Sequence, residues 1–66
     1  MNLLINGRGE HVPDAETVTA LLQAIGYADR RVAVEVNGEI VPRSRHGDHR
    51  LAEGDRVEIV QAIGGG

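Results

Sequence analysis

The alternation of hydrophobic and polar residues predicts a β-hairpin in the middle of the chain. Residues 32–37 carry valine at every second position, with small or polar residues between them, which is typical of a half-buried strand. Asn37-Gly38 follows, and this pair favours a two-residue turn in which both residues have positive φ. Ile40-Val41 is then expected to return as a short strand, which Pro42 ends.

Strand patterns also lie near both ends of the chain. Residues 1–6 contain a short apolar run, and residues 10–12 fit a second strand, with a turn between them that we place at Gly7 to Gly9. Residues 55–63 form the longest apolar strand pattern and follow a tight turn at residues 53–55. We expect this last strand to lie centrally in the sheet, beside the first.

The alternation along the last strand assigns its side chains to two faces. Val57 and Ile59 point one way, towards the expected core. Glu58, Val60 and Ala62 point the other way. We therefore expect Val57 and Ile59 to be buried in the core, and Val60 and Ala62 to lie on the opposite face of the sheet.

Residues 14–26 carry the pattern of an amphipathic helix. Thr17 is a suitable N-cap, because its hydroxyl can accept a hydrogen bond from a free backbone N–H of the first turn. Hydrophobic residues then recur at helical spacing: Val18, Leu21, Leu22 and Ile25. Gly26 is suited to the left-handed conformation that ends many helices. We interpret this helix as packing one side onto the sheet, without a chemical role.

The order of these elements predicts an α+β fold. One helix would pack across a mixed sheet of four to five strands, which is the β-grasp arrangement. The chain of 66 residues is long enough for one small domain. We assign residues 1–63 to this domain and residues 64–66 to a flexible glycine tail.

Composition narrows the possible functions. The chain has no cysteine, so it has neither a disulfide nor a thiolate nucleophile, and its single aromatic residue implies an aliphatic core. A net charge of −3 and a pI near 5.4 disfavour nucleic acid or an anionic membrane as partner. All seven basic residues are arginine, so no side chain can accept an isopeptide bond. No targeting or membrane segment is recognisable, and we expect a cytoplasmic monomer.

The polar stretch of residues 43–50 holds the only metal-like cluster. It combines His46, Asp48 and His49, but a third and fourth ligand of assured position are lacking. We therefore interpret these as solvated loop histidines and expect no metal. Leu51 is the residue available to anchor this loop to the body.

Other candidate chemistry is weak. Ser44 lacks a patterned base, and no glycine-rich loop precedes a helix as in phosphate-binding motifs. We interpret the loop that carries Arg43, Arg45 and Arg50 as a solvated loop that favours solubility, and a docking role for these arginines is the less favoured alternative. The sequence thus predicts no active site, and the chain is expected to be a substrate or a binding module.

The glycines that close the sequence are the remaining candidate. Gly64, Gly65 and Gly66 follow the last strand and would carry a carboxylate up to about 10 Å from it. Without Cβ atoms they could enter a narrow channel of another protein, or they could be an idle frayed end. Val60, Ala62 and Ile63 form either a small partner-binding surface beside this tail or, for Val60, packing under a loop.

Taken together, these features resemble the ubiquitin-like sulfur carrier proteins, most of all those of thiamine biosynthesis (the ThiS family). The resemblance covers essentially the whole chain. The matching residues are Thr17-Val18, Leu21-Leu22, Val36-Asn37, Ile40 to Arg43, Leu51, Gly54-Asp55, Val57 to Val60 and Ile63 to Gly66. The chain departs from the family in residues 44–49, which lack a large apolar residue, and in the additional Gly64.

The resemblance implies that Gly66 is the reacting residue. A ThiF-like adenylyltransferase would use ATP and Mg²⁺ to convert its carboxylate to an acyl-adenylate. A persulfide protein would then supply sulfur, leaving a thiocarboxylate that a ThiG-like thiazole synthase consumes. The chain itself would bind no cofactor and would be a protein co-substrate, not an enzyme. The alternatives are a molybdopterin-synthesis sulfur carrier, a protein modifier and a plain β-grasp interaction domain.

Overall fold

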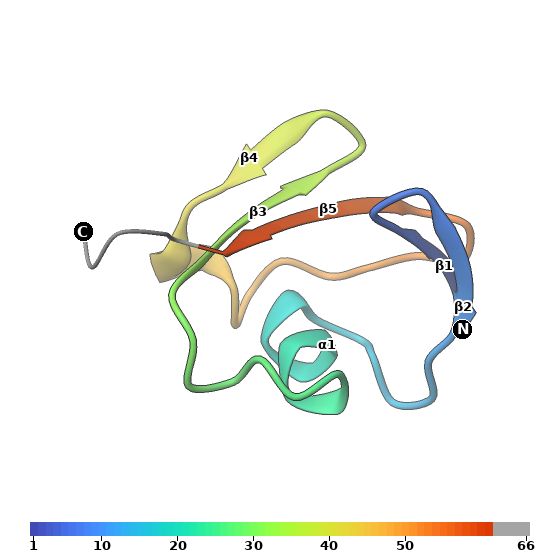
Figure 1. The fold of residues 1–66 in the computed structure, drawn as a ribbon, viewed down its shortest axis with the longest axis horizontal. Helices are drawn as coiled ribbons and strands as arrows, with labels where there is room; N and C mark the ends of the chain where they lie inside the picture. The colour runs from blue at the N-terminus through green and yellow to red at the C-terminus, as the bar shows by residue number, and fades with distance from the viewer. Residues whose placement is uncertain (62–66) are drawn as a thin grey trace.

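A five-stranded mixed sheet and one helix form the two layers of the molecule (Figure 1). The computed structural model describes residues 1–61. The elements are β1 (Asn2–Ile5), β2 (Arg8–His11), α1 (Val18–Ala24), β3 (Val32–Val36), β4 (Glu39–Val41), the 3₁₀ helix η1 (Arg43–Arg45) and β5 (Arg56–Gln61). The α+β fold expected from the sequence is confirmed.

The strand order is β2-β1-β5-β3-β4, so β5 lies in the centre of the sheet. It runs parallel to β1 and antiparallel to β3. Val57 and Ile59 of β5 are buried against the helix layer, whereas Val60 is exposed. The predicted central position of the last strand is therefore confirmed. The predicted assignment of its side chains to a buried and an exposed face is also confirmed for the residues that the structure describes. The boundary placed between residues 63 and 64 lies outside the described residues.

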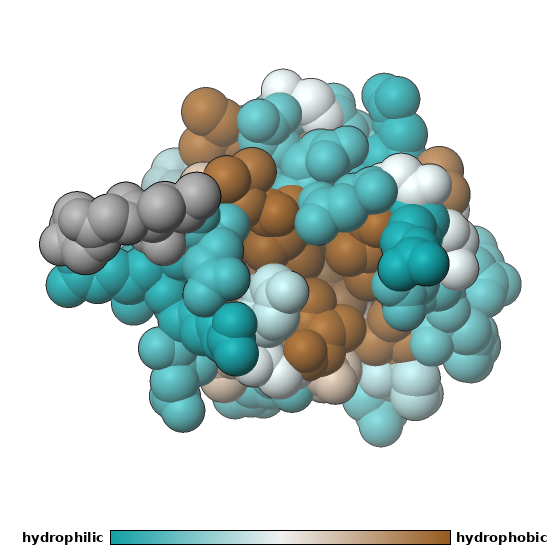
Figure 2. Space-filling view, viewed as in Figure 1, coloured by the Kyte–Doolittle hydropathy of each residue, from teal (hydrophilic) through white to brown (hydrophobic). Residues whose placement is uncertain are grey.

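The core fills the space between the helix and one face of the sheet. Figure 2 shows hydrophobic surface between these two layers, with polar residues around it. The most deeply buried side chains are Leu3, Val18, Leu21, Val34 and Val57. They come from α1 and from three neighbouring strands, which explains why a single aliphatic cluster holds both layers together.

The helix begins and ends as its sequence predicts. The hydroxyl of Thr17 accepts a hydrogen bond from the Ala20 N–H at 3.1 Å. At the other end Gly26 has φ +86°, and the Tyr27 N–H donates to the Leu22 carbonyl at 2.7 Å. This bond and the positive φ define a Schellman ending, which satisfies helix carbonyls that would otherwise lack a donor.

Replacing Thr17 by alanine removes the N-cap acceptor, so we expect a loss of about 1 kcal/mol in unfolding free energy. For a domain of this size, that loss corresponds to a melting temperature lower by about 4–8 °C. Thermal unfolding followed by circular dichroism measures the change. Thr17→Ser keeps the hydroxyl and should retain most of the stability; equal losses in both variants would contradict the capping role.

The first hairpin turns earlier than the sequence interpretation placed it. Asn6 and Gly7 have φ of +50° and +81°, and β2 begins directly after them at Arg8. Gly9 therefore lies inside a strand and not in the turn. The reason is that Asn6-Gly7 alone meets the positive-φ requirement of a two-residue turn. Asn37-Gly38 closes the second hairpin in the same way, as predicted.

Candidate functional site

The candidate site begins where β5 leads towards the glycines, and two asparagine side chains hold this strand. Asn6 follows β1, and its Oδ1 accepts from the Ile59 N–H at 2.7 Å while its Nδ2 donates to the Ile59 carbonyl at 3.2 Å. Asn37 follows β3, and its Oδ1 accepts from the Arg56 N–H at 2.9 Å. Both turns thus extend the hydrogen bonding of the sheet along β5. The sequence analysis predicted Asn37 as a turn residue but assigned Asn6 to the end of the first strand, and it missed the contacts of both residues with β5.

Val60 lies on the sheet face that points away from α1. Its side chain is 62% exposed, and its register partner on β3 is Ala33. The idea that Val60 packs under a loop is therefore wrong. Ile40 on β4 is 74% exposed on the same face. These residues give the sheet a partly apolar open surface near the end of β5.

The remaining predicted site residues belong to the end of the chain. Ala62, Ile63, Gly64, Gly65 and Gly66 lie outside the described residues. Their expected roles in partner binding and in the reaction stay predictions. What the structure supplies is their starting point, because Gln61 ends β5 in register with Val32 of β3.

The segment of residues 43–50 is more ordered than the sequence analysis expected. It contains η1, and His46 is buried with 8% of its surface exposed. The His46 Nε2 donates to the Val41 carbonyl at 3.1 Å. A carbonyl oxygen only accepts, so this nitrogen must carry the hydrogen. The description of His46 as a solvated loop histidine is therefore wrong, and His46 packs inward in a segment without a large apolar residue.

The same segment completes the helix N-terminus. The His49 carbonyl accepts from the Val18 N–H at 3.1 Å, and the His46 carbonyl accepts from the Thr19 N–H at 3.0 Å. The first N–H groups of a helix have no partner within the helix, and these two carbonyls supply acceptors for them. The sequence of the loop gave no indication of these hydrogen bonds. Leu51 is buried, which confirms its predicted role as the anchor of the loop.

Residues 1–61 contain no group of three histidine or acidic side chains close enough together to hold a metal ion. The same residues contain no helix that combines the length and the apolar character of a membrane span. In the part of the chain that the structure describes, no metal-binding cluster therefore competes with the end of β5 as the candidate site.

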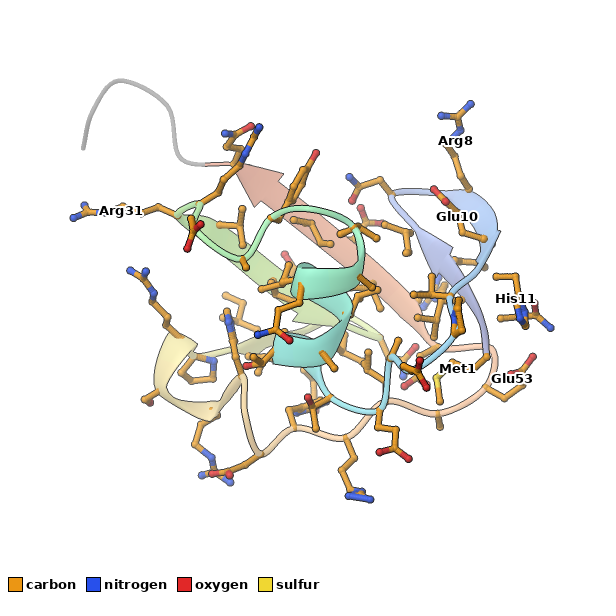
Figure 3. The ribbon with its side chains drawn as sticks, turned by 90° about the horizontal axis from the view of Figure 1, so that it is seen from below. Met1, Arg8, Glu10, His11, Arg31 and Glu53 are labelled. Atoms are coloured by element: carbon orange, nitrogen blue, oxygen red, sulfur yellow. The ribbon has the colours of Figure 1, made fainter. Side chains whose placement is uncertain are left out.

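One carboxylate with a shifted pKa lies at the opposite end of the molecule. The Asn2 N–H donates to Glu53 Oε1 at 2.8 Å, and this hydrogen bond to the charged form holds the pKa of Glu53 below its ordinary value. Figure 3 shows Glu53 near Met1 and His11, far from Arg31 at the other end. The contact joins the start of β1 to the turn before β5 and has no part in the candidate site.

The comparisons with known proteins identify the family. A model of the ThiS family matches residues 3–66, nearly the whole chain. This chain belongs to the ThiS family. The sulfur carrier protein ThiS of Escherichia coli is 30% identical over 66 residues, which cover all of both chains. The crystal structure of the thiamine biosynthesis protein ThiS from Geobacter metallireducens has a TM-score of 0.83 and 40% identity, again over all of both chains.

These matches confirm the family and the β-grasp fold that the sequence predicted. A third relative is longer. A thiazole synthase of Paramagnetospirillum magneticum is 47% identical over 66 residues, and the match covers 100% of this chain but only 20% of that protein. The chain thus spans about a fifth of the length of this relative and of a second thiazole synthase, from Magnetococcus marinus.

Proposed function

We propose that this chain is a sulfur carrier of thiamine biosynthesis and that the carboxylate of Gly66 carries the sulfur. The observation that supports this most strongly is that the ThiS-family match runs through Gly66. Gly66 follows β5 by only five residues, and β5 is held in the centre of the sheet by β1, β3 and the side chains of two asparagines. Sulfur carrier relatives in Escherichia coli and Bacillus subtilis favour the same activity. Relatives named for thiamine and thiazole favour this pathway over molybdopterin synthesis.

The chemistry requires activation because a carboxylate oxygen is a poor leaving group. In the proposed sequence an adenylyltransferase transfers AMP from ATP to the Gly66 carboxylate and releases pyrophosphate, with Mg²⁺ balancing the phosphate charge. A persulfide sulfur then attacks the acyl carbon and displaces AMP. A thiol cleaves the resulting S–S bond and leaves a thiocarboxylate on Gly66. The chain supplies the acyl group and binds no cofactor, so it acts as co-substrate of its partner enzymes.

We assign the open face of the sheet beside β5 to docking of the adenylyltransferase. The exposed Val60, together with Ala62 and Ile63, would contact this partner while Gly66 enters its active site. Apolar side chains that lie near one another on a sheet face are suited to such a contact. Thiazole synthase is the proposed acceptor of the sulfur, and the longer relatives of that name support a close association. We place these reactions in the cytoplasm.

The test is the intact mass of the protein isolated from its own host. We expect a species whose mass exceeds that of the 66-residue chain by the difference between sulfur and oxygen, because one terminal oxygen would be replaced. A host strain without the adenylyltransferase is the control and should contain only the carboxylate form. If wild-type cells that depend on thiamine synthesis also contain only the carboxylate form, the proposal fails.

A further inference from the structure

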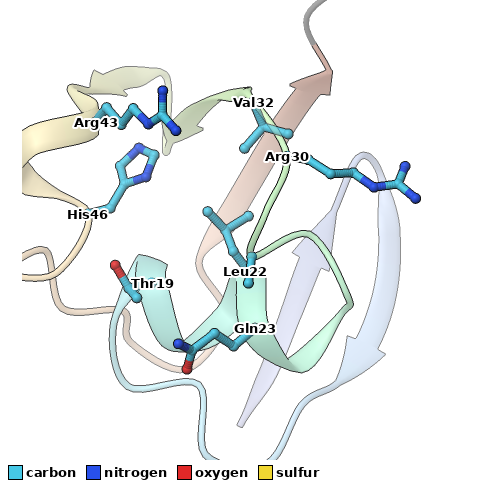
Figure 4. Close-up of a pocket in the computed structure, with 8 residues that line it drawn as sticks. Thr19, Leu22, Gln23, Arg30, Val32, Arg43 and His46 are labelled. Atoms are coloured by element: carbon cyan, nitrogen blue, oxygen red, sulfur yellow. The ribbon is translucent and has the colours of Figure 1, made fainter.

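A small cavity lies on the helix side of the sheet, beside the end of β5. Its volume is about 210 Å³, and it opens between α1, η1 and the start of β3 (Figure 4). Leu22 and Val32 contribute apolar surface, while Thr19 and Gln23 of α1 contribute a hydroxyl and an amide. A space of this size and mixed character fits one side chain of a partner better than it fits a drug-sized ligand.

The charged residues that line the cavity are both basic. They are Arg30 and Arg43, and no described residue of the lining is acidic. This is unusual for a chain with ten acidic residues and a net charge of −3. Arg30 stacks on the Tyr27 ring, with its guanidinium carbon 5.2 Å from the ring centroid. In Figure 4 the Arg30 side chain extends away from His46, whereas Arg43 lies beside it, so Arg43 is the cation next to the polar groups of the cavity.

Arg43 and Arg45 differ in their contacts, although both belong to η1. Both are exposed residues of η1, but Arg45 lies near Asp48, with Nε 3.8 Å from Oδ2, and it does not line the cavity. Arg43 lines the cavity and forms no ion pair with any other described residue. In Figure 4 its side chain lies next to His46, which the bond to the Val41 carbonyl holds in place. A guanidinium beside polar groups of fixed position is well suited to bind a carboxylate.

The cavity also lies beside Gln61, the last residue of the chain that the structure describes. Val32 lines it and is the register partner of Gln61, the last residue of β5. Val60 is exposed on the opposite face of the same strand end. A partner that surrounds this strand end to receive Gly66 would therefore meet Val60 on one side and the cavity on the other.

We propose that the cavity receives an aspartate or glutamate side chain of the adenylyltransferase, with Arg43 pairing with its carboxylate. This inference rests on the proposed function, since it names a second contact of the same docking event. Thr19 and Gln23 provide further hydrogen bonds, and the apolar floor accommodates the methylene groups of the acidic side chain. The two contacts on opposite faces fix the strand end in two directions and so limit where Gly66 is delivered.

The experiment compares Arg43→Gln with Arg45→Gln in ATP–pyrophosphate exchange catalysed by the purified adenylyltransferase of the same host. Both variants remove one positive charge from η1, so they share any effect of net charge. We expect Arg43→Gln to raise the KM for the carrier about tenfold with little change in kcat, because an ion pair made on docking is lost. Arg45→Gln should leave KM within about twofold, because Arg45 does not line the cavity and its exposed ion pair with Asp48 contributes little to stability. Circular dichroism is the control that tests whether both variants are folded.

A charge-reversed pair extends the test. Arg43→Glu should raise KM further, and one acidic-to-arginine substitution in the adenylyltransferase should restore much of the loss, which identifies the partner residue. Salt should raise the KM of the wild type more than that of Arg43→Gln. If both glutamine variants have the KM and the salt dependence of the wild type, the inference is overturned. If the wild type itself is not activated, the proposed function fails instead, so the two failures are distinguishable.

Discussion

Val57→Asp is expected to leave most of the protein unfolded at 25 °C. Val57 has 0% of its surface exposed and lies in β5 between its register partners Ile5 and Val36. An unpaired carboxylate there costs several kcal/mol, whereas a core of this size supplies only about 3–5 kcal/mol in total. The far-ultraviolet circular dichroism spectrum and a urea titration measure the loss.

Val60→Asp should give the opposite result, although the two residues lie on one strand. Val60 is 62% exposed, so a carboxylate there stays in water and the unfolding free energy should fall by about 1 kcal/mol or less. Its effect should appear in activation, as a higher KM for the carrier with the adenylyltransferase. Val60→Thr keeps the shape without adding charge and is the matched control. Equal unfolding in both aspartate variants would contradict the assignment of faces.

The elements that could be predicted from the sequence are those fixed by local rules. The valine alternation in residues 32–36, the N-cap at Thr17 and the turn at Asn37-Gly38 each depend on neighbours within a few residues. The central position of β5 also follows from sequence, because a long apolar strand favours burial between two others. The alternation of side chains along β5 likewise predicts which of its residues are buried and which are exposed.

The features that could not be predicted depend on residues far apart in the chain. Asn6 binds the backbone of Ile59, 53 positions away, and no local pattern indicates that pairing. His46 is buried because its ring donates a hydrogen bond to the Val41 carbonyl and because the His46 carbonyl accepts one from the Thr19 N–H of α1. A polar loop sequence looks the same whether it is solvated or packed on a helix end. The position of Arg43 beside a cavity is a consequence of that packing.

Removing Gly66 should abolish activation almost completely without affecting the fold. Gly66 lies five residues after β5, and no core residue changes in the shortened chain. The carboxylate would be drawn back by one residue, about 3.3–3.6 Å, relative to a docked body that stays in place. A misplacement of even about 1 Å can cost about 100-fold in rate, so the loss should be at least that large. The measurement is ATP–pyrophosphate exchange with the adenylyltransferase of the host.

Two further variants separate the length of the tail from its width. Adding one alanine after Gly66 moves the carboxylate outward and should also prevent activation. Gly66→Ala keeps the length but adds a Cβ, so any loss in this variant reports on the width of the channel that receives the tail. Circular dichroism should give the same spectrum and melting temperature for all of these proteins. If the shortened and the extended chains are activated as well as the wild type, the position of the Gly66 carboxylate does not matter to the reaction, and the sulfur carrier proposal must be abandoned.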